Sequence, residues 1–300
     1  MSKNATETRH DKAIGLDMLE STAVLRLLVE GQQAAASVVT NAIPAISYAA
    51  ALAADALRVG GRLIYVGAGS SGLIAMTDAL ELPGTFGIAK DRITVLMAGG
   101  IASLNDLAGT PEDDVAMAEK DAAVIAADDC VICVSASGST PYVLTVAGLA
   151  RSRGAKLVGM ANNAGAPLFD IVDVTVLLAT PPEVVAGSTR MGAGTAQKIA
   201  FNMLSTLTAI KLGHVHDGHM VDVRADNEKL RIRATRIVSE IAGIDMNAAG
   251  ERMRHADGSV KVAVLLAAGA KDAEVAQAAL ARSGQVLRPA LAEFENNNGN

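Results

Sequence analysis

The chain has 300 residues, half of them hydrophobic, and a formal net charge of −6 at pH 7. This length and apolar content suit a globular protein with a sizeable core, built as one large α/β domain with smaller helical additions. Three tyrosines, four phenylalanines and no tryptophan leave no stacking platform, and the acidic balance leaves no basic stripe, so nucleic acid is excluded as a partner.

The first residues of the chain are polar, and no apolar run reaches the roughly 18 residues that a membrane span needs. We therefore expect a cytoplasmic protein that does not interact with a membrane.

From Asp17 to about Val59, apolar residues recur at helical spacing. This pattern predicts packing helices ahead of the first strand.

Five apolar runs separated by helical segments predict a doubly wound, mainly parallel sheet, whose ligands would bind at the carboxyl ends of the strands. The runs cover residues 63–66, 93–97, 130–134, 156–160 and 172–178. A long helix is expected over residues 195–212, ending at Gly213. Short helical segments beyond Arg231, separated at Gly243, Gly250, Gly258 and Gly269, predict a small helical bundle. The expected parts are an N-terminal helical segment (1–57), the sheet domain (58–230) and a C-terminal helical subdomain (231–300).

A glycine-rich turn follows the first predicted strand, with the sequence Gly67-Ala-Gly69-Ser70-Ser71-Gly72. Free backbone amides at the start of a helix favour an anion, and glycine lets a ligand approach the main chain closely. The spacing also fits a dinucleotide fingerprint, but the next strand ends in Ala98-Gly-Gly100, without the carboxylate that holds a ribose. The turn therefore favours a terminal phosphate, with Gly69, Ser70 and Ser71 as candidate ligands.

A second hydroxyl-rich turn leaves the third predicted strand, as Ser135-Ala-Ser137-Gly-Ser139-Thr140-Pro141. Thr140 and Pro141 suit the N-cap and first position of a helix. Three serines and a threonine exceed what capping needs, although an ordinary serine-rich turn remains an alternative. Because both turns lie at the carboxyl edge of the sheet, they predict one pocket for a sugar phosphate.

Two other groups of residues are candidate metal sites, but each has a simpler structural interpretation. Cys130 and Cys133 fall within a predicted strand, where residues three apart point to opposite faces, so two buried thiols are favoured over a redox or zinc pair. His214, His216 and His219 follow a predicted helix end without further ligands nearby. A solvated or hydrogen-bonding cluster is favoured there, and no metal is expected.

The paired serine-rich turns resemble those of the sugar-isomerase (SIS) domain, and longer motifs sharpen the resemblance to the N-acetylmuramic acid 6-phosphate etherase family. The likeness runs from about Thr6 to the C-terminal helices. Its motifs are Arg62-Leu-Ile-Tyr-Val-Gly-Ala-Gly-Ser-Ser-Gly72, Asp78-Ala-Leu-Glu-Leu-Pro-Gly-Thr-Phe-Gly87, Ser135-Ala-Ser-Gly-Ser-Thr-Pro-Tyr142, Gly187-Ser-Thr-Arg-Met-Gly-Ala-Gly-Thr-Ala-Gln-Lys198, Asn202-Met-Leu-Ser-Thr206 and Met220-Val-Asp-Val223. Ser188 and Arg190, in the fourth motif, are further substrate-binding candidates, although Arg190 equally suits a structural ion pair.

The resemblance implies a cytoplasmic homodimer, without metal or organic cofactor, that removes D-lactate from N-acetylmuramic acid 6-phosphate in cell-wall sugar recycling. It assigns two catalytic carboxyls. Glu81 matches the position that protonates the leaving ether oxygen, and Glu112 matches the second glutamate, which we interpret as the base at C2. From the residues alone, Glu112 suits the first turn of a helix begun by Thr110 and Pro111, and Glu81 suits a solvated helix end.

The separation of Glu81 from the glycine-rich turn bears on the oligomeric state. Glu81 lies twelve residues beyond Gly69, and an intervening helix rises roughly 1.5 Å per residue, which places its carboxyl on the order of 15 Å from its own phosphate loop. A hexose phosphate is shorter than that. We therefore expect Glu81 to complete the pocket of a partner subunit in a homodimer with shared sites.

The chain departs from the family pattern at three positions where a cation is expected, which carry Leu73, Ser139 and Gly192 instead. A lost charged hydrogen bond to an anion costs about 1.5 to 3 kcal/mol unless Arg190 or Lys198 compensates. Two alternatives to the etherase therefore stay open. One is a lyase or isomerase acting on another sugar phosphate, and the other is a non-catalytic phosphosugar sensor.

Overall fold

The computed structural model describes residues 5–100, 110–223 and 227–295. Backbone contacts divide the chain into two compact units. The sheet unit comprises Met1–Leu80 and Asp91–Leu207, and the helical unit comprises Glu81–Lys90 and Thr208–Asn300. The three-part domain division expected from the sequence stays a prediction.

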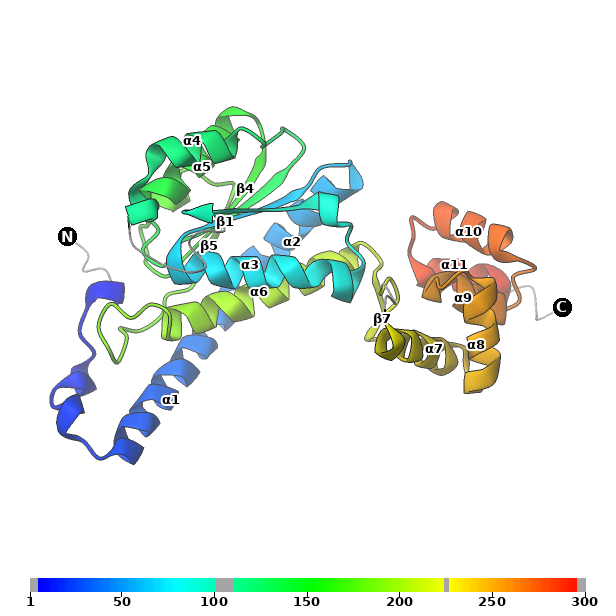
Figure 1. Ribbon diagram of the computed structural model, residues 1–300, viewed down its shortest axis with the longest axis horizontal. Helices are drawn as coiled ribbons and strands as arrows, with labels where there is room; N and C mark the ends of the chain where they lie inside the picture. Colours follow the sequence, from blue (N-terminus) through cyan, green and yellow to red (C-terminus); the bar gives the residue numbers. More distant parts are fainter. Residues whose placement is uncertain (1–4, 101–109, 224–226, 296–300) are drawn as a thin grey trace. The chain divides into compact units, whose positions relative to one another are not determined.

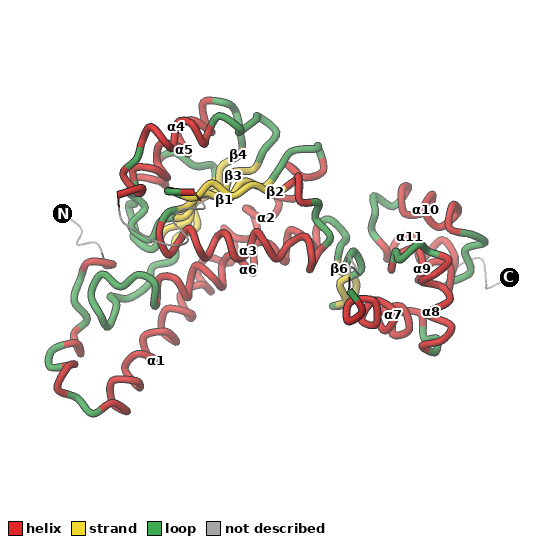
Figure 2. Tube along the Cα trace, in the orientation of Figure 1, coloured by secondary structure: helices red, strands yellow, loops and turns green. Residues whose placement is uncertain are grey.

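A parallel five-stranded sheet in the order β2-β1-β3-β4-β5 forms the centre of the sheet unit (Figure 2). Its register pairs Leu63 with Ile93 and Cys130, Cys130 with Lys156, and Val158 with Val174. Continuous apolar runs form these strands because helices cover both faces of the sheet. The expected doubly wound parallel sheet is confirmed, with strands β1 (Leu63–Gly67), β2 (Ile93–Met97), β3 (Cys130–Val134), β4 (Lys156–Ala161) and β5 (Val174–Leu177).

One face of the sheet is covered by α4 (Val115–Ala122) and α5 (Pro141–Ser152). The other face is covered by α2 (Ile43–Arg58), α3 (Gly69–Phe86) and α6 (Gly192–Lys211), as Figure 1 shows. Cys133 packs in the core beneath α4 and α5, whereas Cys130 has the opposite strand parity. Both thiols are free and buried, and burial raises the pKa of each to about 12, as expected of structural cysteines.

On the other face, a buried polar network joins the sheet to two helices. The hydroxyl of Tyr65 donates to Asp78 on α3 at 3.0 Å, and the same carboxylate accepts from Asn202 and Ser205 on α6. The ring of Tyr65 also packs against Phe201, with 5.7 Å between centroids. This network holds the first helix after β1 in place, and with it the glycine-rich turn.

The N-terminal helices differ in their burial. α1 (Ser21–Val38) buries only Ala35, while α2 packs an alanine-rich face on the sheet. The stretch Ser21–Arg58 contains an 18-residue window long and apolar enough to cross a membrane, with 33% of that window buried. This window is judged by its mean hydropathy and is not one continuous apolar run, since Thr40, Asn41 and Ser47 interrupt the stretch.

The helical unit has its own apolar core, which Val262, Leu265, Ile237 and Leu280 share. The ammonium of Lys261, 3% exposed, is ion-paired with Asp222 inside this unit. A two-stranded hairpin of β6 (Val215–His216) and β7 (His219–Met220) precedes the bundle. The expected C-terminal bundle is confirmed, with helices α7 (Glu228–Ala242), α8 (Met246–His255), α9 (Val260–Ala267), α10 (Ala273–Arg282) and α11 (Leu287–Glu295).

Three local expectations were wrong. Gly250 does not separate two helices but lies inside α8. Glu81 does not lie at the end of its helix, because α3 continues to Phe86 with Pro83 inside it. Thr110 does not start α4. Residues Thr110–Asp113 form a separate 3-10 turn, η7, and Asp114 is the N-cap of α4, its side chain accepting from the amide of Met117 at 2.8 Å.

Candidate functional site

A polar cavity of about 200 Å³ lies where the carboxyl ends of the central strands meet their following turns. All of its lining residues belong to the sheet unit. They come from the N-terminal 3-10 turn η1 (Ala5–Glu7), the turns after β1 and β3, η7, and the segment before α6. The lining residues are Thr6, Glu7, Ala68, Ser70, Ser71, Glu112, Ser135, Ala136, Ser137, Thr140, Gly187 and Thr189.

The glycines of the first turn allow a tight connection from β1 into α3. A methyl group added at Gly67 would lie 2.7 Å from Cα of Gly72, so the strand end and the first helical turn touch at backbone level. Gly69 has a φ of 52°, in the left-handed region that favours glycine. The helix begins there, which places Ser70 and Ser71 in its first turn beside the cavity.

In the second turn the hydroxyls bond to one another. Oγ of Ser135 lies 2.7 Å from Oγ1 of Thr140 and 3.2 Å from Oγ of Ser137. The amides of Gly138 and Ser139 donate to the same serine hydroxyls, at 3.0 and 3.2 Å. Thr140 is the N-cap of α5, as expected, but its side chain makes no capping bond. Three rotatable hydroxyls that can both donate and accept therefore face the cavity.

Glu112 brings a carboxylate to the start of α3. Its Oε1 would lie 2.5 Å from a methyl group added at Gly69, so the carboxylate is against the glycine backbone. Burial raises the pKa of Glu112 above its ordinary value, and the neighbouring negative charge of Asp113 raises it further. A half-buried carboxyl with a raised pKa, next to hydroxyls and the N-terminus of a helix, is suited to proton transfer.

The structure brings together most of the predicted site residues and leaves others outside the cavity. Ser70, Ser71, Ser135, Ser137, Thr140 and Glu112 line it, and Gly69 borders Glu112. The hydroxyl of Ser139 instead donates to Ser137, and the residue is exposed. The lining set also omits Ser188, Arg190 and Glu81, the last of which is an exposed residue of the helical unit.

No lysine or arginine belongs to the described lining of this cavity. Arg190 and Lys198 are exposed and do not border it. Of the three positions expected to carry a cation, Leu73 is half-buried on α3 and Gly192 is buried. The amides of Gly192 and Ala193 donate to the buried carboxylate of Glu183 at 2.9 and 2.8 Å. The start of α6 is therefore already occupied by an anion of the chain itself.

Six lining residues were not predicted as site residues: Thr6, Glu7, Gly187 and Thr189, and also Ala68 and Ala136, which lie within the two predicted turns. The first two belong to a short 3-10 turn without a hydrophobic pattern, and Thr6 is 157 residues from its hydrogen-bonding partner Asn163. No local signal in the sequence predicts such a contact.

The histidine cluster makes hydrogen bonds and ion pairs in the helical unit. Nδ1 of His214 lies 2.6 Å from the carbonyl oxygen of Phe86, and His219 lies 3.6 Å from Glu240. Within the described residues, no three histidine, cysteine, aspartate or glutamate side chains converge as a metal site requires.

Known proteins match this chain over most of its length. A model of the SIS domain matches residues 29–162. An N-acetylmuramic acid 6-phosphate etherase of Deinococcus radiodurans is 43% identical over 97% of this chain and 96% of its own length. This chain belongs to the N-acetylmuramic acid 6-phosphate etherase family. The etherase of Geobacillus thermodenitrificans is 38% identical over 96% of the chain and 98% of its own length.

Among solved structures, a proposed phosphosugar isomerase of Bacteroides fragilis superposes on this etherase-family chain with a TM-score of 0.50. It is 22% identical and covers 65% of the chain and 94% of itself, which supports the SIS-type fold. Because relatives over nearly the whole length are named etherases, this family member is an enzyme of the carbon–oxygen lyase class.

Proposed function

We propose that the chain is an N-acetylmuramic acid 6-phosphate etherase, which converts its substrate and water into N-acetylglucosamine 6-phosphate and D-lactate. The observation that carries this proposal is the cavity that Glu112, whose carboxylate lies against the start of α3, shares with the hydroxyls of the turn after β3. The near full-length likeness to proteins named as this etherase supports the same substrate.

The reaction needs one base and one acid. In the ring-opened sugar, the aldehyde at C1 acidifies the proton at C2, and Glu112 takes that proton. The electron pair forms a C2–C3 double bond as the C3–O bond breaks, and the ether oxygen gains a proton to leave as lactate. Water then adds to C3 and a proton returns to C2. Each positioned carboxyl contributes about 10² to 10⁴ in rate.

The charges around the cavity suggest how the substrate lies in it. An anion beside Gly69 would be repelled by the carboxylate of Glu112, which lies against that glycine. The turn after β3 offers hydroxyls and an uncapped helix start without a carboxylate among them. We therefore place the phosphate at Ser135, Ser137 and Thr140, and C2 near Glu112.

The second carboxyl would come from another subunit. Glu81 lies twelve residues along the continuous helix α3 from Gly69, which at a rise of about 1.5 Å per residue is farther than a hexose phosphate can span. We assign it the role of acid in the partner's pocket of a cytoplasmic homodimer. Exposed apolar side chains on the N-terminal elements, such as Met18, Leu25 and Val29, support a subunit contact there.

A lactate assay on the purified chain tests this function. We expect release of D-lactate from N-acetylmuramic acid 6-phosphate, and a kcat lowered by about 10² or more in Glu112→Gln. The matched control Glu119→Gln changes an exposed glutamate on the neighbouring helix α4 and should keep wild-type activity. Absence of lactate with correctly folded protein would contradict the proposal.

A second candidate substrate follows from the lack of lysine or arginine in the described cavity lining. A sugar phosphate with an uncharged substituent at C3 would need no cation for a lactyl carboxylate. Thermal-shift and turnover measurements on a series of hexose phosphates, with and without a charged C3 substituent, separate this candidate from the etherase.

A further inference from the structure

The side chain of one asparagine connects the N-terminal turn η1 to the turn after β3 by hydrogen bonds. The side chain of Asn163, which follows β4, accepts from the amide of Thr6 at 3.4 Å and donates to its hydroxyl at 3.0 Å. Its amide group also lies 3.4 Å from the carbonyl oxygen of Ala136, between Ser135 and Ser137. Thr6 and Asn163 are both buried, at 4% exposure each.

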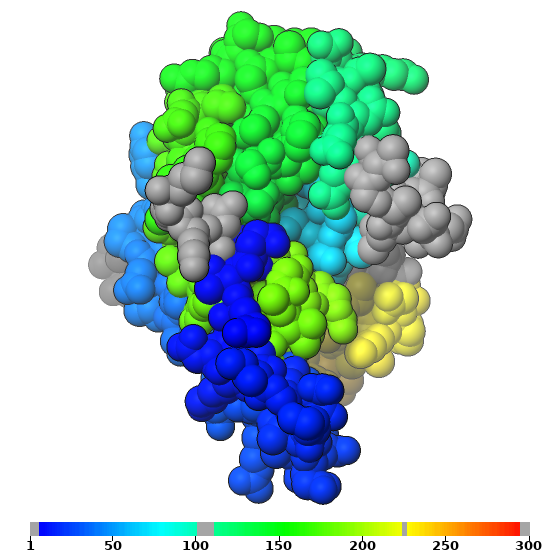
Figure 3. All heavy atoms as spheres, turned by 90° about the vertical axis from the view of Figure 1, so that its left-hand side faces the viewer, coloured from blue at the N-terminus to red at the C-terminus, as the bar shows by residue number. Residues whose placement is uncertain are grey.

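This attachment brings a second carboxylate to the cavity. Glu7 is adjacent to Thr6 and lines the cavity together with Gly187 and Thr189. Its Oε2 would be 3.9 Å from a methyl group added at Gly187, so the side chain reaches the segment before α6. In Figure 3 the blue N-terminal segment lies against the yellow-green part of the chain, which includes this segment. The elimination and hydration steps assigned to Glu112 and Glu81 do not use Glu7.

A carboxylate accepts hydrogen bonds and donates none when ionised, so it selects the neutral donors of a ligand and repels its anions. In a sugar phosphate the donors are hydroxyls and, in an N-acetylated sugar, the amide N–H. The hydroxyls of the turn after β3 can either donate or accept, and they suit the phosphate oxygens. Glu7 therefore suits the donor groups of such a ligand, and the turn after β3 suits its phosphate.

We propose that Glu7 is a substrate-binding residue that accepts hydrogen bonds from the hydroxyl or amide groups of the sugar, and that Thr6 and Asn163 are its positioning residues. The identity of the sugar rests on the proposed function, but binding of a polyhydroxylated phosphate does not. Glu7 contributes to affinity and to the choice of sugar, and it transfers no proton.

The first experiment compares Glu7→Ala with Glu20→Ala, which changes an exposed glutamate just before α1. Calorimetry with N-acetylglucosamine 6-phosphate should show affinity lowered by about tenfold or more in Glu7→Ala and unchanged in Glu20→Ala. Inorganic phosphate should bind Glu7→Ala at least as tightly as wild type, because a negative charge has been removed. Equal losses for both ligands, or no loss for the sugar phosphate, would overturn the proposal.

The second experiment separates binding from catalysis. With N-acetylmuramic acid 6-phosphate as substrate, Glu7→Ala should raise KM by about tenfold or more and leave kcat within a few-fold. A kcat lowered a hundredfold at unchanged KM would instead make Glu7 a proton-transfer group and overturn the assignment. If the wild-type chain releases no lactate, the proposed function fails, while the calorimetric comparison still decides the role of Glu7.

The role of the positioning residues is tested by a measurement that a general loss of stability would not change. Thr6→Val removes the hydroxyl that Asn163 binds, and Thr6→Ser keeps it. We expect Thr6→Val to weaken sugar-phosphate binding and Thr6→Ser to bind the sugar phosphate as wild type does. Neither variant should change the binding of inorganic phosphate. Equal binding by the two variants would show that the hydroxyl does not position Glu7.

Discussion

Glu112 combines a half-buried position with a like-charged neighbour, and both raise its pKa. A general base must be ionised to act, so a raised pKa moves the acidic limb of the rate profile to higher pH. Asp113 follows it in the 3-10 turn η7 and supplies the negative charge. The turn before α4 thus sets the proton affinity of the residue we assign as the base.

The first prediction concerns this pair. Replacing Asp113 with Asn removes the like charge, which lowers the pKa of Glu112 and shifts the acidic limb of kcat/KM to lower pH. Asp91→Asn, an exposed carboxylate in the turn before β2, serves as the control and should leave the limb in place. The measurement is the pH profile of lactate release. A shift to higher pH in Asp113→Asn would contradict the assignment of Glu112 as the base.

Position 67 requires a glycine because another part of the backbone lies too close for a side chain, and not because its φ angle is positive. Its added methyl group would meet Cα of Gly72 at 2.7 Å, which the backbone can relieve only by moving. In α5, by contrast, a methyl group added at Gly148 meets nothing within 4 Å.

The second prediction compares these two sites. We expect Gly67→Ala to destabilise the fold by about 2 kcal/mol or more because two backbone segments are forced apart. Gly148→Ala should stabilise it by about 0.5 to 1 kcal/mol, since alanine lowers the entropy of the unfolded chain in a helix. Urea unfolding measures both, and a stabilising Gly67→Ala would show that the β1–α3 turn is loosely packed.

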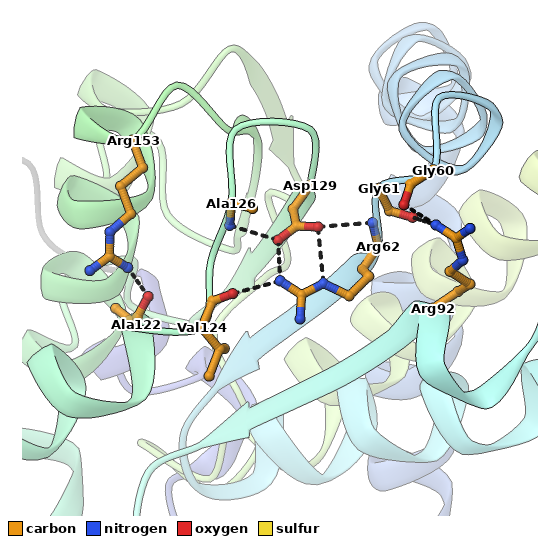
Figure 4. A network of polar contacts seen from close by, with 9 residues as sticks. All are labelled: Gly60, Gly61, Arg62, Arg92, Ala122, Val124, Ala126, Asp129 and Arg153. Carbon is orange, nitrogen blue, oxygen red and sulfur yellow. Dashed lines mark hydrogen bonds and ion pairs between the residues drawn. The ribbon is translucent and has the colours of Figure 1, made fainter.

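At the scale of elements, one carboxylate joins the starts of two central strands. Asp129, before β3, accepts from the backbone amide of Arg62 at 2.9 Å and from its guanidinium at 2.7 and 3.1 Å (Figure 4). Its side chain is 2% exposed. Burial raises the pKa of Asp129, but hydrogen bonds from Arg62 and from the amide of Ala126 outweigh it, so the pKa lies below its ordinary value.

The third prediction follows from this pair. Asp129→Asn should lower the free energy of unfolding by about 2 to 4 kcal/mol at neutral pH, because the Arg62 guanidinium and the amides lose a charged acceptor. The pKa of Asp129 is lower in the folded protein than in the unfolded chain. Its stabilisation of the fold is therefore complete above the ordinary aspartate pKa and is lost as the pH falls through the pKa of the folded state.

Its control is Asp55→Asn, which breaks the exposed pair with Arg58 and should cost less than about 0.5 kcal/mol. Denaturant unfolding at several pH values measures both variants. A stability difference between wild type and Asp129→Asn that grows as the solution is acidified would contradict a lowered pKa for Asp129 in the folded protein.

At the scale of the whole molecule, the proposed assignment of the two catalytic glutamates makes assembly a condition of activity. Glu112 lies in the cavity of the sheet unit, whereas Glu81 belongs to the other compact unit and is exposed. Under this proposal each working site takes one glutamate from each subunit.

The fourth prediction is complementation between inactive chains. A dimer of one Glu81→Gln chain and one Glu112→Gln chain, isolated by two different affinity tags, should recover about half of the wild-type activity, because one of its two symmetric sites holds both glutamates. Each homodimeric variant should be inactive in the lactate assay. An inactive mixed dimer would show that both glutamates act within one chain.

Much of the fold could be predicted because its signals are local. The five apolar runs became strands within two residues of their expected ends, since strands buried on both faces must be apolar throughout. The helix start near Glu112 was misread because Thr110 and Asp114 both suit an N-cap. Only the folded backbone places the side chain of Asp114 over the amide of Met117.

The sequence by itself determined the sheet, the two hydroxyl-bearing turns and the family, because each is written in residues adjacent along the chain. The tertiary structure decided which side chains share a cavity. It left Ser139 and Arg190 outside the lining and added Glu7, whose neighbour Thr6 is hydrogen-bonded to Asn163 far along the chain. Such choices depend on packing between distant segments, and no local pattern of residues encodes them.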